Sequence, residues 1–324
     1  TLADTPNITI VVPCYNEAKR LAIPQFRSFL VSHPEVRFLF VNDGSRDNTL
    51  EVLNALVAED PRHYEVLDLE KNGGKAEAVR RGMVKALAEG ANYAGYWDAD
   101  LATPLAEIPR FVDTLETHRE RDVVFGSRVR LLGRAIARRA LRHYLGRLFA
   151  TVASFVLDLP VYDTQCGAKM FRSSDEARTL FATRFNVNWT FDVEVIARLQ
   201  RSRLRAQNPR DASSCIYELP LNEWHDVAGS KVRPKDFFKA FFEMLLVYRM
   251  YGRGSRRALG WASLAIELRG PFPCHPLQRT LHRARWQSRL SRTVCSCGER
   301  RPSSERCPRR SLPRAPGSVS RSVG

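Results

Sequence analysis

Two aspartates, Asp98 and Asp100, follow an apolar run at 93–97 with one residue between them. Side chains two positions apart on an extended segment point to the same side, so we expect the two carboxylates to share one site. Two negative charges held close together resist joint ionisation unless a cation lies between them. Mg²⁺ or Mn²⁺ prefers oxygen ligands and can also bind a diphosphate. The pair therefore predicts a metal site for a ligand that carries a diphosphate.

Two earlier apolar runs also end in polar residues. The run at 8–12 is followed by Pro13, Tyr15 and Glu17, and the proline ends a strand. An aromatic ring and a carboxylate at a sheet edge suit a base and a ribose. The run at 38–41 is followed by Asn42 and Asp43, whose side-chain oxygens could pair with the edge of a nucleobase. An ordinary turn is the alternative at both places.

The segment 71–75, Lys-Asn-Gly-Gly-Lys, is not a phosphate-binding loop of the Walker type. No glycine stands five residues before Gly74, and Ala76 follows Lys75 where that motif needs Ser or Thr. The segment instead predicts a glycine-containing turn into a helix whose N-terminus could face an anion.

Arginines supply permanent positive charge near the same motifs. Arg128 follows the apolar run at 123–125, and Arg138 and Arg142 lie four residues apart on an expected helix, so they share one face. The last two could clamp a phosphate. A solvated basic stripe is the alternative, since further arginines lie nearby at 134, 139 and 147.

The residues between these motifs predict a mostly parallel sheet wrapped by helices. Strands are expected at 8–12, 38–41, 64–69, 93–97 and 123–125, and helices at about 17–32, 48–59, 74–89 and 104–119. Several of the strands are continuously apolar, as in strands covered on both faces. Ligands of such sheets bind beyond the carboxyl ends of the strands, which is where the motifs lie.

The pattern changes after about residue 134. We expect a long basic and apolar helix there, a loop at 161–169, and a helix near 192–205. A last helix, 235–251, carries phenylalanines and leucines at helical spacing among Lys and Arg residues. It is either a core-packing helix or an interfacial helix that lies in a membrane surface.

The net charge of +16 does not indicate a nucleic-acid binder. Residues 253–324 hold 16 Arg, no Lys and three Glu, so they carry +13, and residues 1–252 carry only +3. We expect one domain at 1–252, with a nucleotide-binding half at about 1–130 and an acceptor half at about 131–252. The tail at 253–324, rich in Arg, Pro and Ser, is expected to be disordered, or an aberrant extension on which no function depends.

Cysteines and apolar runs favour a cytoplasmic protein that is soluble or peripheral at the cytoplasmic face of a membrane. Cys14, Cys166 and Cys215 are scattered singly, as in a reducing compartment, and the Cys-Ser-Cys at 295–297 lacks a partner pair at zinc-site spacing. The longest apolar run, 148–157, is far shorter than the ~20 residues that span a bilayer. No signal peptide is expected at the start.

The motifs together resemble the inverting family-two glycosyltransferases with the GT-A fold, a Rossmann-like α/β fold. The resemblance is strongest to the branch that acts on dolichyl and polyprenyl phosphates. It covers about residues 6–250 and depends on an ordered set: VVPCYNE, VNDGSRDNT, NGGKAEA, DAD, GSR, DTQCGAK, FDVE and a Trp followed by GSK. Two departures are Asn42, where the family often has Asp, and Ala76, where it has Gly.

The resemblance implies roles for individual residues. Those expected at the nucleoside are Pro13, Tyr15, Glu17, Asn42 and Asp43. Those expected at the metal and diphosphate are Asp98, Asp100, Ser230 and Lys231, and Lys75 is expected to bind the substrate. Those expected at the acceptor phosphate or the reacting sugar are Arg128, Arg138, Arg142, Asp163, Gln165 and Lys169.

The implied reaction is a metal-dependent, inverting transfer of a hexose, glucose, from UDP-glucose to a polyprenyl or dolichyl phosphate. A lipid phosphate arrives as a dianion and needs positioning more than a general base. A sugar hydroxyl acceptor is an alternative, with Asp163 or Asp192 as the base. A non-catalytic membrane adaptor that binds a nucleotide sugar is another. A nucleotidyltransferase is disfavoured, because no glycine-rich loop follows the first strand.

Overall fold

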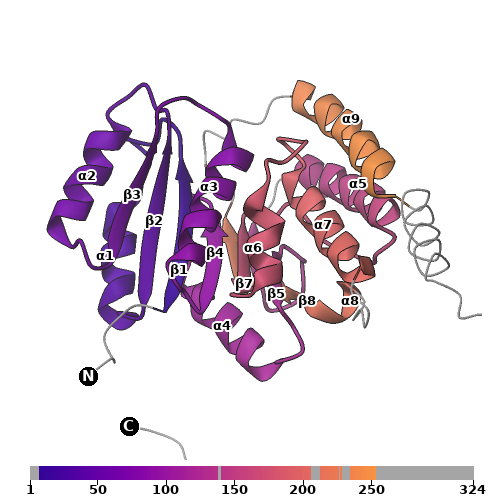
Figure 1. Cartoon of the computed structure of the whole chain (residues 1–324), viewed down its shortest axis with the longest axis horizontal. Helices are drawn as coiled ribbons and strands as arrows, with labels where there is room; N and C mark the ends of the chain where they lie inside the picture. Colours follow the sequence, from indigo (N-terminus) through magenta and orange to yellow (C-terminus); the bar gives the residue numbers. More distant parts are fainter. Residues whose placement is uncertain (1–6, 138–139, 206–211, 226, 228–233, 253–324) are drawn as a thin grey trace, which may run out of the picture. The chain divides into compact units, whose positions relative to one another are not determined.

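A seven-stranded sheet forms the centre of the described chain (Figure 1). The computed structural model describes residues 7–137, 140–205, 212–225, 227 and 234–252, and for residues 137, 140–145 and 234–237 it describes the backbone alone. The strand order is β3-β2-β1-β4-β7-β5-β8, and each strand is parallel to its neighbours except β7. The strands are β1 (Ile8–Cys14), β2 (Val36–Asp43), β3 (Tyr64–Leu69), β4 (Tyr93–Trp97), β5 (Val123–Ser127), β7 (Ala168–Arg172) and β8 (Ile216–Pro220). A separate parallel pair joins β6 (Ala135–Ala137) to β9 (Glu223–His225).

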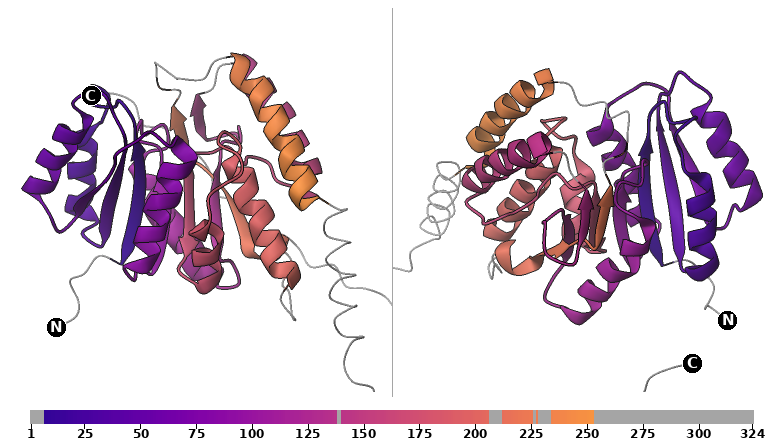
Figure 2. Two further views of the ribbon diagram at one scale, coloured as in Figure 1. Left: turned by 45° about the horizontal axis from the view of Figure 1, so that its top comes forward. Right: turned by 180° about the vertical axis from the view of Figure 1, so that it is seen from behind.

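Helices cover both faces of the sheet, which explains why several strands are apolar throughout. In β1, Val11 belongs to one buried cluster, whereas Ile10 and Val12 belong to the other. The cluster with Ile10 and Val12 includes α1 (Ile23–Ser32), α2 (Thr49–Glu59) and α4 (Ile108–Thr117). The cluster with Val11 includes α3 (Lys75–Ala88), α6 (Asp175–Ala182), α7 (Phe191–Arg205), the short α8 (Ala212–Cys215), and parts of α5 (Ala140–Leu157) and α9 (Pro234–Tyr251). Figures 1 and 2 show α5 and α9 side by side, at the end of the molecule away from β3.

The predicted fold class and the five predicted strands are confirmed, but two predicted helices have different limits. The helix expected at 17–32 begins only at Ile23. Asn16 has a φ of 51°, and the backbone N–H of Glu17 donates to Thr49 Oγ1 at 2.8 Å, so this segment is a turn tied to the start of α2. The helix expected at 104–119 is a short 3₁₀ turn, η1 (Leu105–Glu107), followed by α4, with Pro109 in the first turn of α4.

The second half of the chain departs more from expectation. The helix expected from 134 begins at Ala140, after β6, and the loop expected at 161–169 runs into β7, which lies antiparallel between β4 and β5. β7, α6 and β8 were not predicted. β7 and β8 are five residues long and contain polar residues such as Lys169 and Glu218, so they lack a continuous apolar run. The helices expected near 192–205 and at 235–251 are confirmed as α7 and α9.

Some predictions concern residues outside this description. Arg138, Ser230, Lys231 and the tail at 253–324 lie outside the described residues, and Arg142 is described only as a backbone position in α5. Among the helices that are described, none combines the length and the apolar character that crossing a membrane requires.

Candidate functional site

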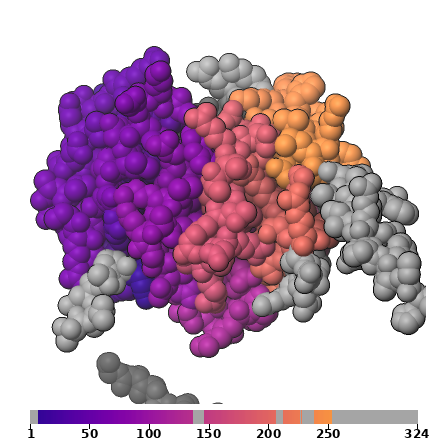
Figure 3. Space-filling view, in the orientation of Figure 1, coloured from indigo at the N-terminus to yellow at the C-terminus, as the bar shows by residue number. Residues whose placement is uncertain are grey.

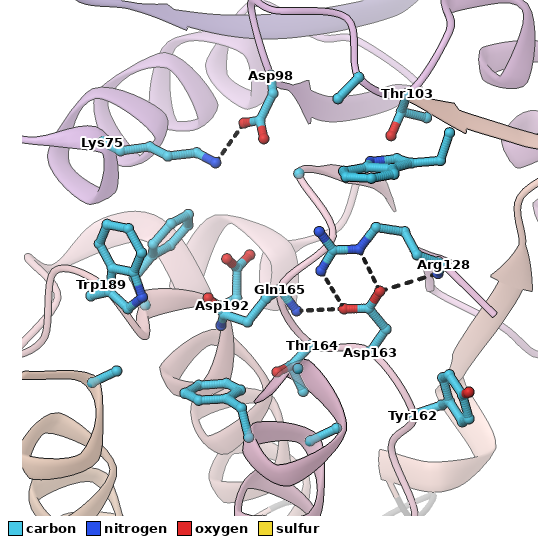
Figure 4. Close-up of a pocket in the computed structure, with 18 of the residues that line it drawn as sticks. Lys75, Asp98, Thr103, Arg128, Tyr162, Asp163, Thr164, Gln165, Trp189 and Asp192 are labelled. Carbon is cyan, nitrogen blue, oxygen red and sulfur yellow. Dashed lines mark hydrogen bonds and ion pairs between the residues drawn. The ribbon is translucent and has the colours of Figure 1, made fainter. Parts of the chain in front are cut away.

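A cavity of about 350 Å³ lies at the carboxyl ends of β4 and β5 and extends to α5, α7 and α9. Its wall combines the polar residues that follow the strands with small and aromatic residues of the helices (Figure 4). Six of the predicted site residues line it: Lys75, Asp98, Asp100, Arg128, Asp163 and Gln165. The topology therefore brings together residues that are up to 90 positions apart in the sequence.

Asp98 and Asp100 both face the cavity, but through a turn rather than along an extended strand. β4 ends at Trp97, and the backbone N–H of Leu101 donates to the carbonyl of Asp98 at 3.1 Å. Asp98 Oδ1 lies 2.5 Å from Lys75 Nζ, and Asp100 Oδ2 lies 4.0 Å from Arg20. Burial and the neighbouring Asp98 carboxylate raise the pKa of Asp100, which is the repulsion that a bound cation relieves.

The pair fits a hard divalent cation in its chemistry. Carboxylate oxygens are the donors that Mg²⁺ and Mn²⁺ favour, and the described part of the chain has no group of three or more acidic, His or Cys side chains that could hold a metal ion. Asp98 and Asp100 would therefore supply two ligands, and the remaining ones would be diphosphate oxygens and water. The bound diphosphate would therefore complete the coordination of the cation.

Asp43, at the end of β2, fixes the position of Lys75. The Asp43 carboxylate accepts from the backbone N–H groups of Gly73 and Gly74, at 2.7 and 2.9 Å. Gly74 has a φ of 84°, which glycine adopts without strain, and α3 begins at the next residue, Lys75. Partial burial opposes the charge on Lys75, but Asp98 and Asp192 outweigh it and raise its pKa. Asp43 thus positions a cation in the cavity, in addition to any role at a nucleoside.

The other residues predicted at the nucleoside lie beside the cavity, at the ends of β1 and β2. Cys14 is paired in register with Asn42, which brings Pro13, Tyr15 and Asn42 to one edge. The amide of Asn42 is buried and donates to Asp68 at 2.7 Å. Glu17 is linked to the carboxylate pair through Arg20, which lies 3.6 Å from Glu17 and 4.0 Å from Asp100. Their contact with a nucleoside stays a prediction.

Arg128 and Asp163 form a bidentate ion pair in the cavity wall. Nε and Nη2 of Arg128 donate to the two oxygens of Asp163 at 2.7 and 2.8 Å, and the backbone N–H of Gln165 donates to Asp163 at 3.1 Å (Figure 4). Burial opposes the charge of Arg128, yet Asp163 raises the pKa of its guanidinium. The Arg128 charge is therefore largely neutralised within the protein. Within the described residues, Nε2 of Gln165 is buried without a hydrogen-bond partner, so it can donate to a ligand.

Lys169 does not line the cavity, and the prediction that it binds substrate is wrong in that respect. It lies in the middle of β7, fully buried, with Nζ 2.7 Å from Asp192 Oδ1 and 2.6 Å from the carbonyl of Cys166. The hydroxyl of Tyr96, also buried, donates to the same oxygen of Asp192 at 2.5 Å. Asp192 itself lines the cavity. Lys169 therefore does not reach the cavity itself, but its ammonium group holds in place the Asp192 carboxylate, which does.

The loop that carries Trp189 forms one wall of the cavity, and the sequence analysis did not predict it. Asn188 and Trp189 line the cavity, and Trp189 is 38% exposed. One carboxylate of α9, Glu243, accepts from the backbone N–H groups of residues 188, 189 and 190 at 3.3, 2.8 and 2.9 Å. On the other side, the buried Glu194 accepts from the backbone N–H groups of residues 186 and 187. The only sequence signal was the Trp before the FDVE motif, and Glu243 is more than 50 residues away.

Comparison with known proteins places this site in a family. Residues 9–179 match the family described as glycosyl transferase family 2. The dolichyl-phosphate beta-glucosyltransferase of Trichomonas vaginalis is 30% identical over 251 residues, 74% of this chain and 70% of that protein. The enzyme of the same name from Dictyostelium discoideum is 30% identical over 264 residues, 75% of this chain and 76% of that protein.

A solved structure shares the fold. Glucosyl-3-phosphoglycerate synthase from Mycobacterium tuberculosis, crystallised with Mn²⁺, UDP and glucosyl-3-phosphoglycerate, superposes with a TM-score of 0.53 at 18% identity over 75% of this chain and 80% of that chain. The matched residues 9–179 include the carboxylates that follow β4, Arg128 after β5, and the segment of Asp163 and Gln165. The sheet order, the cavity at its carboxyl edge and the similarity over most of the chain agree, and the protein is a glycosyltransferase that belongs to glycosyl transferase family 2.

Proposed function

We propose that this glycosyltransferase transfers glucose from UDP-glucose, with inversion, to the phosphate of a dolichol or another polyprenol at a membrane surface. The observation that carries the proposal is the shape of the cavity. It joins the carboxylates of Asp98 and Asp100 to α5 and α9, the two helices with exposed apolar faces. The names of the relatives support the same donor sugar and acceptor class.

The pairing of the acidic residues favours a phosphate acceptor over a sugar hydroxyl. Both oxygens of Asp163 accept from Arg128, and Oδ1 of Asp192 accepts from Lys169 and Tyr96. A hydroxyl acceptor needs a base that can take up its proton, and these positively charged or proton-donating partners make both carboxylates weaker bases. A phosphate monoester has a second pKa of about 6, so it enters as a dianion that attacks without losing a proton.

The residues of the cavity then have distinct tasks in a single displacement at the anomeric carbon. Asp98 and Asp100 would hold a divalent cation, Mg²⁺ or Mn²⁺, which supplies positive charge to the departing diphosphate. Lys75 adds a second positive charge beside Asp98. The buried Nε2 of Gln165 offers a hydrogen bond to the sugar. The attack of the phosphate oxygen on one face of the sugar and departure of the diphosphate from the other give inversion.

The outer faces of α5 and α9 fit a lipid bilayer. Buried Ala240, Met244 and Val247 seat α9 on the protein, so the helix packs against the core as one prediction held. Its other face exposes large apolar side chains, which is the pattern of an interfacial helix. These residues, with two of α5, are Leu148 (63% exposed), Phe155 (76%), Phe238 (74%), Phe241 (52%), Phe242 (68%) and Leu245 (49%). The surface of α9 is orange in Figure 3. Exposed Lys239 and Arg249 complement anionic lipid.

The first test is transfer of radiolabelled glucose from UDP-glucose to a polyprenyl phosphate, with and without Mn²⁺ or Mg²⁺. The wild type is expected to label lipid only with the cation, and Asp100→Asn is expected to lower the rate about 100-fold or more. Asp113→Asn, at an exposed aspartate of α4 outside the cavity, is the matched control. Slow hydrolysis of UDP-glucose without labelled lipid would mean that the acceptor is wrong. No reaction with any nucleotide sugar would favour a non-catalytic adaptor.

The second test measures flotation with vesicles of phosphatidylcholine, with and without phosphatidylserine. Phe242→Asp is expected to reduce the bound fraction about tenfold or more, since burying a phenylalanine contributes roughly 1.5–3 kcal/mol. Val31→Asp makes the same kind of change at a residue of α1 that is 85% exposed, and it should leave binding unaltered. Equal losses in the two variants, or no binding by the wild type, would contradict the membrane assignment.

A further inference from the structure

The three cations that line the cavity differ in their partners. Lys75 is paired with Asp98, and Arg128 is paired through two hydrogen bonds with Asp163. Arg147 lies on α5, and within the described part of the chain no carboxylate pairs with its guanidinium. Its central carbon instead lies 4.2 Å from the centre of the Tyr162 ring. Arg147 therefore brings to the cavity a permanent positive charge that the described residues do not neutralise.

Tyr162 is itself held firmly beneath Arg147. Its backbone N–H donates to both oxygens of Glu218 on β8, at 2.9 Å each, and the N–H of Asp163 donates to the same carboxylate at 2.8 Å. These bonds fix the backbone of Tyr162, from which its ring projects, to β8. A guanidinium that stacks on an aromatic face keeps its N–H donors in the plane, directed outward around its edge. Such donors match the oxygens of a phosphate.

The cavity that Arg147 lines has both polar and apolar walls. Asp98 and Asp100 contribute carboxylates, whereas Gly146 and Ala150 of α5 and Ala240 of α9 contribute small apolar positions. The next residue after Arg147, Leu148, is 63% exposed and belongs to the apolar outer face of α5. A ligand held by Arg147 would have its anionic group in the cavity and could extend an apolar chain along the surfaces of α5 and α9.

We propose that Arg147, stacked on Tyr162, forms an anion subsite that binds the phosphate of an acceptor with an apolar chain. This inference rests on the proposed function, because the acceptor class comes from it. Arg147 takes the role at the acceptor phosphate that was predicted for Arg128, whose charge Asp163 neutralises. Tyr162 is the positioning residue, since it acts on the ligand only through Arg147.

The test separates binding from turnover. Calorimetric titration with citronellyl phosphate, a short isoprenoid phosphate, uses the full chain and needs no donor sugar. Arg147→Gln is expected to weaken binding about 10- to 100-fold, as for the loss of a hydrogen bond to a charged group. Arg119→Gln removes one positive charge from an exposed position just after α4, outside the cavity, and should change binding less than about twofold. Citronellol, which lacks the phosphate, should not distinguish Arg147→Gln from the wild type.

Two further variants examine the stacking. Tyr162→Leu should weaken citronellyl phosphate severalfold, whereas Tyr162→Phe keeps the ring and should bind as the wild type. In transfer assays, Arg147→Gln should raise the KM for polyprenyl phosphate and leave the KM for UDP-glucose within about twofold. Equal binding by wild type and Arg147→Gln, or no binding by the wild type, would overturn the subsite. Arg147-dependent binding without transfer to lipid would uphold the subsite and refute the proposed function.

Discussion

Gly167→Ala tests whether the position of Asp98 matters for catalysis. A Cβ at residue 167 would lie 1.9 Å from Asp98 Oδ2 and 2.2 Å from its Cγ. Ordinary contact needs roughly 3.5 Å, so the carboxylate must move by about 1.5 Å. Its partner Lys75 Nζ, now 2.5 Å from Oδ1, cannot follow without leaving its own place. A displacement of about 1 Å in a catalytic arrangement can cost about 100-fold in rate, or roughly 2.7 kcal/mol.

The fold should survive this change, because the Asp98 side chain is 35% exposed and can swing outward. We therefore expect a fall of about 100-fold or more in kcat/KM for glucose transfer, with a change of less than about 1 kcal/mol in the free energy of urea unfolding. Gly90→Ala should behave in the opposite way. Gly90 has a φ of 84° and open space around it, so alanine there costs roughly 1–2 kcal/mol in stability and leaves kcat/KM unaltered. A Gly167→Ala enzyme with full activity would refute the assignment of Asp98 to the reacting centre.

Three further predictions concern stability. Lys169→Met leaves the buried Asp192 without its cation and should lower the free energy of urea unfolding by about 3–5 kcal/mol. Adding Asp192→Asn should restore most of this loss. A loss below about 1 kcal/mol would contradict the pairing. Glu243→Ala leaves three backbone N–H groups without their acceptor, and it should lower the free energy of unfolding by about 1–3 kcal/mol and also lower kcat/KM. An unchanged stability and kcat/KM would show that the loop does not depend on α9. Burial raises the pKa of Cys215 from 9.0 to about 11, so the folded protein retains a proton that the unfolded chain loses in this range. Stability should therefore fall by about 1.3 kcal/mol between pH 8 and pH 10, and Cys215→Ala should remove that part of the fall.

The first half of the fold could be read from the sequence because its signals are local. A strand such as β1 is apolar throughout and ends at Pro13, and the next strand ends in the polar pair Asn42 and Asp43. Parallel pairing then places these ends at one edge without any knowledge of distant contacts. The Asp98 and Asp100 pair could be found from its place after β4, although a turn rather than an extended strand brings both carboxylates to the cavity.

The second half of the fold could be predicted less well because its features depend on partners far away in the chain. Lys169 was expected in a loop at the substrate, yet it is a strand residue that is buried only because Asp192 neutralises it. Arg128 has the expected place but is paired with Asp163. No local pattern reports such pairings. Trp189 was missed for the same reason, since its loop is held by Glu194 and Glu243 rather than by its own sequence.

The hydrogen bonds from Glu243 to the loop at 188–190 also bear on how the protein is made. The strands that carry Asp98 and Arg128 are complete before half of the chain has been synthesised, whereas Glu243 follows Trp189 by 54 residues. A ribosome adds about 5–20 residues per second. Asp98 and Arg128 are therefore synthesised several seconds before Glu243, which holds the loop at 188–190 in place. Any chain that stops short of residue 243 would lack the carboxylate that holds the Trp189 wall of the cavity.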